Sequence, residues 1–185
     1  MIRAGGLGWF PAVAGLAAGV LLILTELFPI RFVITKTATC QDLAPQHLKD
    51  SCLVIGHESH IWGLAVLGLL VLVMTFGAVV GGSRPAAIAI LTAGTVALGI
   101  TLLHDLPQTT KTGGVGADYA SAHGHAGTGF WLEVVGSTLA LACGAFLTLL
   151  RPEPLGPRLR AVRAGEEGTG PPAAAPPDAE EPASA

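Results

Sequence analysis

The sequence predicts an all-α integral membrane protein, a bundle of four transmembrane helices joined by loops on either side of the bilayer. Two observations predict it: four apolar runs of 18 to 22 residues, and the near absence of charge within them. The runs occupy residues 9–30, 61–80, 86–103 and 129–150. With about 1.5 Å of rise per residue, each is long enough to cross a hydrocarbon layer about 30 Å thick. A helix also satisfies its own backbone groups, as lipid requires.

The first run, residues 9–30, contains one charged residue, Glu26. Its 22 residues are long for the hydrophobic region of a signal peptide, and no A-x-A cleavage site follows. We therefore expect it to remain in the mature protein as the first spanning helix. A short N-terminal segment, residues 1–8, precedes it.

The first long loop, residues 31–60, holds two of the three cysteines, Cys40 and Cys52. An oxidising compartment permits a disulfide, and we expect these two residues to pair. By chain entropy such a bridge stabilises a fold by about 3 kcal/mol. β-branched residues follow Arg31, and Cys52-Leu-Val-Ile is a second short apolar run. This pattern predicts a short β pair braced by the disulfide.

Four helices with cysteines in an outer loop are similar in topology to the vitamin K epoxide reductases and the quinone-coupled disulfide oxidases. Those families use a C-x-x-C pair, in which one thiol attacks and the other resolves. Cys143 has Ala140 and Phe146 at the relevant positions, so the pair is missing and a redox relay is not predicted. A sheet outside the membrane is similar to that of claudin-like proteins, but their Gly-Leu-Trp signature is missing too.

The remaining elements follow from composition. Runs 61–80 and 86–103 contain no charge, and run 129–150 contains only Glu133. Segment 104–128 is rich in Gly, Thr and Ala, which predicts an irregular loop over the helix ends. Residues 151–185 are first basic and then acidic and rich in Pro and Ala, which predicts a disordered tail.

The basic residues predict the orientation. Six of the ten lysines and arginines lie in short segments at one end of the runs: Arg3, Arg84, Arg151, Arg158, Arg160 and Arg163. The other four are spread over the two long loops. The positive-inside rule then places both termini in the cytoplasm, with loops 31–60 and 104–128 outside the plasma (cytoplasmic) membrane.

Small residues recur at helical spacing within the runs, as in the Gly15 and Gly19 pair of the first run. Small residues allow helix backbones to approach closely in membranes. The glycines expected at helix contacts are Gly15, Gly19, Gly77, Gly81, Gly136 and Gly144. We therefore expect a tight bundle.

One ionisable residue lies in each run or directly beside it, near the predicted outer boundary: Glu26, His60, His104 and Glu133. Such groups usually face protein or water, because exposure to lipid is costly. Together they suit Zn²⁺ or another divalent transition metal, or a pH-sensitive contact. The alternative is that they lie within a turn of the interface and pair with nearby loop groups. The further candidate ligands are His57, His123 and His125.

A haem site is the less favoured cofactor prediction. His60 and His104 lie nearly symmetrically about the turn at residues 81–85, so they reach similar depth and suit two axial ligands. Axial histidines of membrane cytochromes usually lie deeper in the span than these. We do not predict haem b.

Two function classes follow. No catalytic motif or cofactor fingerprint is found in the sequence, so we expect a non-enzymatic accessory subunit or an envelope or scaffold component. Its outer loops would contact other membrane subunits or a second copy of the chain. The alternative is a metal-, proton- or ion-handling protein that uses the Glu/His residues. The formal net charge of −3 and the acidic tail argue against nucleic-acid binding.

Overall fold

A computed structural model describes residues 9–35, 40 and 52–150 of the chain. The predictions for residues 1–8 and 151–185 lie outside the described residues. The described elements, in chain order, are α1 (Phe10–Thr25), β1 (Pro29–Ile34), β2 (Leu53–Ile55), α4 (Gly56–His60), α5 (Gly63–Gly81), α6 (Arg84–Ile100), the π-helical segment η2 (Thr101–Asp105), α7 (Leu106–Thr109), α8 (Val115–Asp118), β3 (His123–Ala126) and α9 (Thr128–Leu150).

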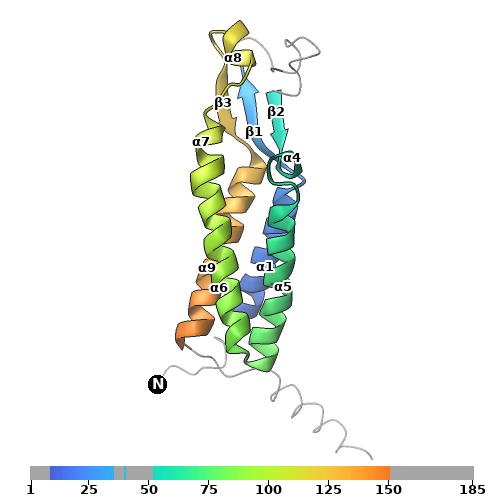
Figure 1. Ribbon diagram of the computed structural model, residues 1–185, viewed down its shortest axis with the longest axis vertical. Coiled ribbons are helices and arrows are strands. Elements are labelled where there is room, and N and C mark those ends of the chain that lie inside the picture. Colours follow the sequence, from blue (N-terminus) through green and yellow to red (C-terminus); the bar gives the residue numbers. More distant parts are fainter. Residues whose placement is uncertain (1–8, 36–39, 41–51, 151–185) are drawn as a thin grey trace, which may run out of the picture.

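Four helices, α1, α5, α6 and α9, run side by side, with a small sheet at one end of the bundle (Figure 1). Each helix packs on two neighbours, α1 on α5 and α9, and α6 on the same two. The end of the bundle that carries the sheet is called the sheet end below. The first turn of α1 and the last turn of α9 lie at the opposite end.

Three helical stretches among the described residues are long and apolar enough to cross a membrane: Gly63–Gly81, Arg84–Thr109 and Thr128–Leu149. The first helix is apolar but shorter, because α1 has 16 residues and ends at Thr25 rather than at the predicted residue 30. Pro29 accounts for this end, since a proline disfavours helical backbone in the residue before it. The chain enters β1 at that proline.

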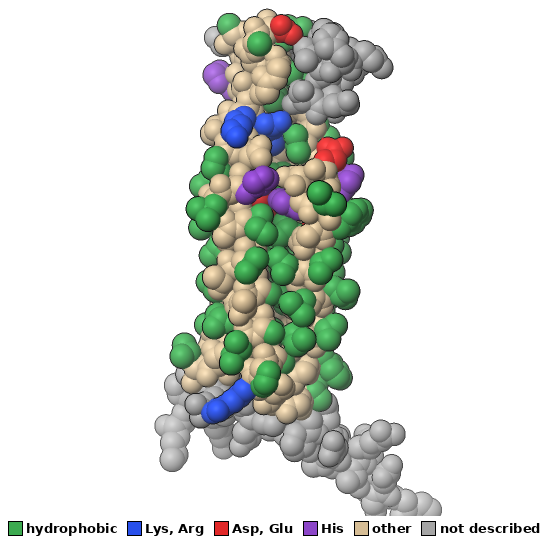
Figure 2. All heavy atoms as spheres, viewed as in Figure 1, with side chains coloured by type: hydrophobic (Ala, Val, Ile, Leu, Met, Phe, Trp, Pro, Cys, Tyr) green, Lys and Arg blue, Asp and Glu red, His purple; other side chains and the backbone are tan. Residues whose placement is uncertain are grey.

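Apolar side chains both fill the bundle and cover it. Leu22, Leu64, Val71 and Ile90 are fully buried between the helices. Other large apolar side chains, such as Phe76, are exposed on the outside of the helices, where Figure 2 shows a hydrophobic band between the two more polar ends. A surface of this kind suits lipid rather than water.

Glycines set the closest helix contacts. A Cβ on Gly15 or Gly19 would collide with side chains of α5, and one on Gly144 with the backbone of Leu91 in α6. Gly136 faces Leu21 and Leu22 across the α1–α9 contact. A Cβ on Gly77 would make an ordinary contact with Ala86, and Gly81 faces open space. The closest approaches therefore lie along α1 and α9.

The sheet is antiparallel, with strand order β2-β1-β3. Cys40 and Cys52 form the expected disulfide beside it, and both sulfurs are buried against Val33 and Val115. The third strand was not predicted, because segment 104–128 was expected to be irregular. His123-Gly-His-Ala becomes a strand by pairing with the open edge of β1, and Gly124 fits tightly against the backbone of Thr109–Lys111.

The helix predicted over residues 86–103 continues further. After α6 the chain makes a π-helical turn, η2, and then α7, so helical structure extends to Thr109. Pro107 lies in the first turn of α7, directly after the π-helical turn. The predicted loop 104–128 therefore begins as helix, and this brings Asp105 into the bundle.

Candidate functional site

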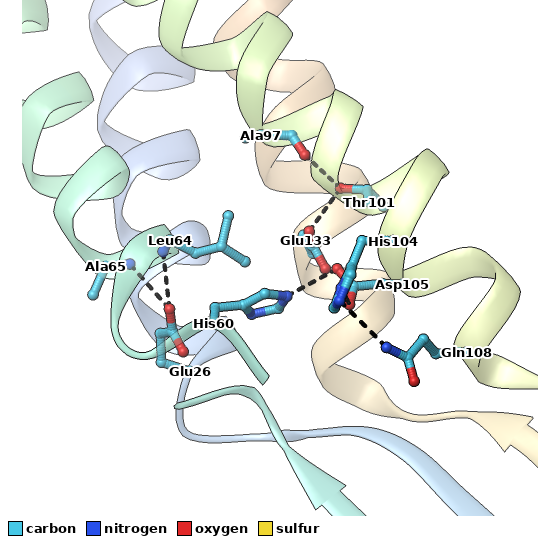
Figure 3. Close-up of polar contacts among 10 residues, drawn as sticks. All are labelled: Glu26, His60, Leu64, Ala65, Ala97, Thr101, His104, Asp105, Gln108 and Glu133. Atoms are coloured by element: carbon cyan, nitrogen blue, oxygen red, sulfur yellow. Dashed lines mark hydrogen bonds and ion pairs between the residues drawn. The ribbon is translucent and has the colours of Figure 1, made fainter. Parts of the chain in front are cut away.

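Polar side chains meet at the sheet end of the bundle, just inside the sheet (Figure 3). Glu26 lies at the end of α1, His60 at the end of α4, Asp105 in η2 and Glu133 in the second turn of α9. The three acidic residues are 0% exposed. Buried charged groups are costly in or near a membrane, so their partners decide what they do.

Asp105 lies between two imidazoles. Its Oδ2 atom is 2.9 Å from Nε2 of His60, and its Oδ1 atom is 3.0 Å from Nδ1 of His104. The His60 side chain is 5% exposed and that of His104 is 51% exposed. His104 is therefore the solvent-side member, and its Nε2 atom lies 3.3 Å from Nε2 of Gln108.

The π-helical turn places Asp105 at the centre of the site. In a regular α-helix His104 would share a face with Ala97 and Thr101. A π turn contains more residues than an α turn, so Asp105 takes that inner position and His104 moves to the rim. Such single π turns are frequent at functional sites. Four-residue spacing from Thr101 was the sequence signal that could have identified Asp105.

Glu133 lies directly behind Asp105. Its Oε1 atom is 2.9 Å from the Thr101 hydroxyl, which is also 2.9 Å from the Ala97 carbonyl oxygen. The hydroxyl has one hydrogen to share between these two acceptors. On its other side Glu133 interacts with the carboxyl group of Asp105. Two carboxyl groups thus face each other inside the protein.

Glu26 has a different environment. Its Oε1 atom accepts hydrogen bonds from the backbone N–H groups of Leu64, at 2.9 Å, and Ala65, at 3.4 Å. These are orphan N–H groups of the first turn of α5, where Trp62 at the N-cap supplies no side-chain acceptor. Ile61 and Trp62 have φ angles of 50° and 64°, and this left-handed backbone separates α4 from α5. Glu26 therefore caps α5.

Three atoms near this end are buried without a hydrogen-bond partner among the described residues: Oε2 of Glu26, Nδ1 of His60 and Oε2 of Glu133. Most buried polar atoms have a partner, so such atoms mark places where a ligand or water fits. A fourth is Nε of Arg31, in β1, and burial lowers the pKa of this guanidinium.

The other predicted histidine ligands lie elsewhere. His57 has its Nδ1 atom 3.2 Å from the Glu26 carbonyl oxygen and stacks on Trp62. His123 and His125 lie in β3, where the His125 ring stacks on Phe32. The two histidines considered for haem share Asp105, so a porphyrin between them would have to displace that carboxylate.

Three side chains lie close enough together to bind one metal ion. His60, His104 and Asp105 each present a ligand atom, and these atoms lie within 4.8 Å of one another. Imidazole nitrogen and carboxylate oxygen are the donors of many zinc and other transition-metal sites. We call His60, His104, Asp105 and Glu133 the polar cluster.

No protein-family model matches the sequence, and no curated protein or solved structure matches it either. Function therefore has to be inferred from the polar cluster itself.

Proposed function

We propose that this protein is a multi-pass membrane protein that binds a divalent transition-metal ion at the sheet end of its helix bundle. The observation that carries the proposal is the buried Asp105 carboxylate held between the imidazoles of His60 and His104. A metal ion held by these three side chains would replace the hydrogen bonds between them with coordinate bonds.

The ligand types favour zinc and its neighbours over calcium or magnesium. Calcium and magnesium prefer sites built from oxygen alone, whereas imidazole suits Zn²⁺, Cu²⁺, Ni²⁺ and Fe²⁺. Half-exposed His104 would meet the ion first at the rim, and nearly buried His60 would hold it from inside. The site thus has an open side and a closed side.

In this proposal all four helices cross the bilayer and the sheet end faces outward. The basic residues that precede α1, begin α6 and follow α9 in the sequence support that orientation. The disulfide beside the sheet supports it too, because disulfides persist in oxidising compartments. The metal would therefore be taken from outside the cytoplasm. The tail after residue 150 would lie in the cytoplasm.

Metal analysis of the full-length protein, purified in a mild detergent without chelators, tests the proposal. We expect about one divalent transition-metal ion per chain after incubation with Zn²⁺ and desalting. A double variant, His60→Ala with His104→Ala, should lose it. The matched control is His123→Ala with His125→Ala, which removes two histidines of β3 and should keep the ion. A wild-type protein without saturable Zn²⁺ binding would overturn the proposal.

The accessory-subunit role predicted from the sequence stays a prediction. Co-purification of the tagged protein from its native membrane, read by mass spectrometry, would test it. A stoichiometric partner would support that role, and the metal assay on the same sample would show whether the two roles coexist.

A further inference from the structure

We propose that Glu133 is the fourth ligand of this site and that its carboxylate makes the filled site electrically neutral, so that the site selects divalent over monovalent ions. This inference rests on the metal-binding function proposed above. It adds a ligand that lies outside the three clustered groups, and it names the charge class of the ion.

The first support is the position of Glu133. Its carboxyl group interacts with that of Asp105, and its Oε2 atom is buried without a hydrogen-bond partner among the described residues. Two carboxyl groups in contact need a cation or a shared proton between them to be stable. A metal ion bound by Asp105 would meet this requirement.

The second support is the way Glu133 is held. Thr101 lies in the first position of η2, one π turn before Asp105, and its hydroxyl contacts Oε1 of Glu133. The hydroxyl oxygen also lies 2.9 Å from the Ala97 carbonyl oxygen of the same helix, which holds the Thr101 side chain in place (Figure 3). Groups that hold a ligand in this way orient it toward the metal. Oε1 is thus anchored and Oε2 is left for the ion.

The third support is charge. Two neutral imidazoles and one carboxylate around a divalent ion leave one net positive charge at a buried position in the bundle. A second carboxylate from Glu133 cancels it, and net charge is costly where water is excluded. A monovalent ion in the same four-ligand site leaves a net negative charge. The two buried carboxylates therefore favour an ion of charge two.

Glu26 provides the matched comparison. It is as buried as Glu133 and its Oε2 atom is likewise unpartnered among the described residues, but two backbone N–H groups at the start of α5 offset its charge at Oε1, whereas Glu133 lies against Asp105. We therefore place it outside the ligand set. The pair Glu133→Gln and Glu26→Gln removes one buried carboxylate in each case and changes side-chain volume very little.

The experiment measures affinity for Zn²⁺ by competition with a chelating dye, and affinity for Ag⁺ as the monovalent probe, on full-length protein in detergent. Glu133→Gln should weaken Zn²⁺ binding at least about tenfold. Ag⁺ binding should stay within about threefold, so the preference for the divalent ion falls. Glu26→Gln should leave both affinities within about threefold. The visible absorption of bound Co²⁺, which reports coordination, should change in Glu133→Gln alone.

Two results would overturn the inference in distinguishable ways. If wild-type protein binds Zn²⁺ and Glu133→Gln binds it equally well with the same Co²⁺ spectrum, Glu133 is not a ligand and the three-ligand site stands. If wild-type protein binds no metal, the proposed function falls as well. Should Glu133→Gln not fold, Glu133→Asp replaces it: the shorter side chain keeps the charge, withdraws the oxygen and should again weaken Zn²⁺ binding, with Glu26→Asp as its control.

Discussion

Two buried glutamates at the same end of the bundle have opposite surroundings. Glu26, at the end of α1, accepts two backbone N–H groups of α5. Glu133, in α9, faces another carboxyl group and receives one shared hydroxyl. Both are fully buried. The comparison shows that burial by itself does not separate a structural carboxylate from a functional one, and that the partners do.

The largest effect is expected at the polar cluster, which is the region of Glu133. Replacing Asp105 with Asn removes the carboxylate that both His60 and His104 contact. We expect Zn²⁺ affinity to fall by about 100-fold or more, because even supporting residues cost about 10–100-fold. Equilibrium dialysis with radioactive zinc would measure the loss. Retention of wild-type affinity would place the metal somewhere other than the polar cluster.

The next largest effect is a loss of stability in the Glu26 region, meaning Glu26 and the first turn of α5. Glu26→Ala removes the acceptor for the first N–H groups of α5, and we expect it to lower the free energy of unfolding by about 2 kcal/mol. Denaturation by increasing detergent, followed by circular dichroism, would show this loss, while Zn²⁺ binding at saturating metal should persist. A variant as stable as wild type would refute the capping role.

A smaller effect should follow from Thr101→Val, which keeps the side-chain shape and removes the hydroxyl against Glu133. We expect Zn²⁺ affinity to fall by about tenfold, the usual loss for a group that orients a ligand. Thr92→Val is the control, because Thr92 bonds only to the Ile88 carbonyl on the exposed side of α6. Equal affinities in the two variants would argue against an oriented Glu133.

The smallest effect should come from His57→Ala. His57 contacts the Glu26 carbonyl oxygen and stacks on Trp62, so it belongs to the Glu26 region despite its nearness to His60 in sequence. We expect Zn²⁺ affinity within about twofold of wild type and a stability loss of about 0.5–1 kcal/mol. A large loss of metal affinity would erase the distinction between the two regions.

Several features of the fold were predictable because they depend on local composition. Three helices long enough to cross a membrane and a shorter one form over the apolar runs, although the third extends beyond its run to Thr109, and the Cys40–Cys52 disulfide forms as expected. The third strand was not predictable, since β3 has little strand propensity of its own and depends on the edge of β1. Pro29 indicates in the sequence that the first helix stops before residue 30, but a prediction from hydropathy alone does not take account of it.

The positions of the four ionisable residues were predicted in part. Glu26, His60, His104 and Glu133 do lie at one end of the bundle, but a regular α-helix would place His104 on the inner face, and Asp105 was assigned to a loop. One π-helical turn reverses these two positions. A regular helical repeat cannot reveal such a turn, because it assumes a constant number of residues in each turn.

The sequence by itself determined that apolar helices form this protein and that its ionisable groups gather near their ends, because hydropathy and charge act locally along the chain. Only the tertiary structure decided which of those groups meet. The capping of α5 by Glu26 and the contact of Glu133 in α9 with Thr101 in η2 both join segments far apart in sequence. The energy of a buried charge depends on those contacts, and so does the chemistry that it can perform.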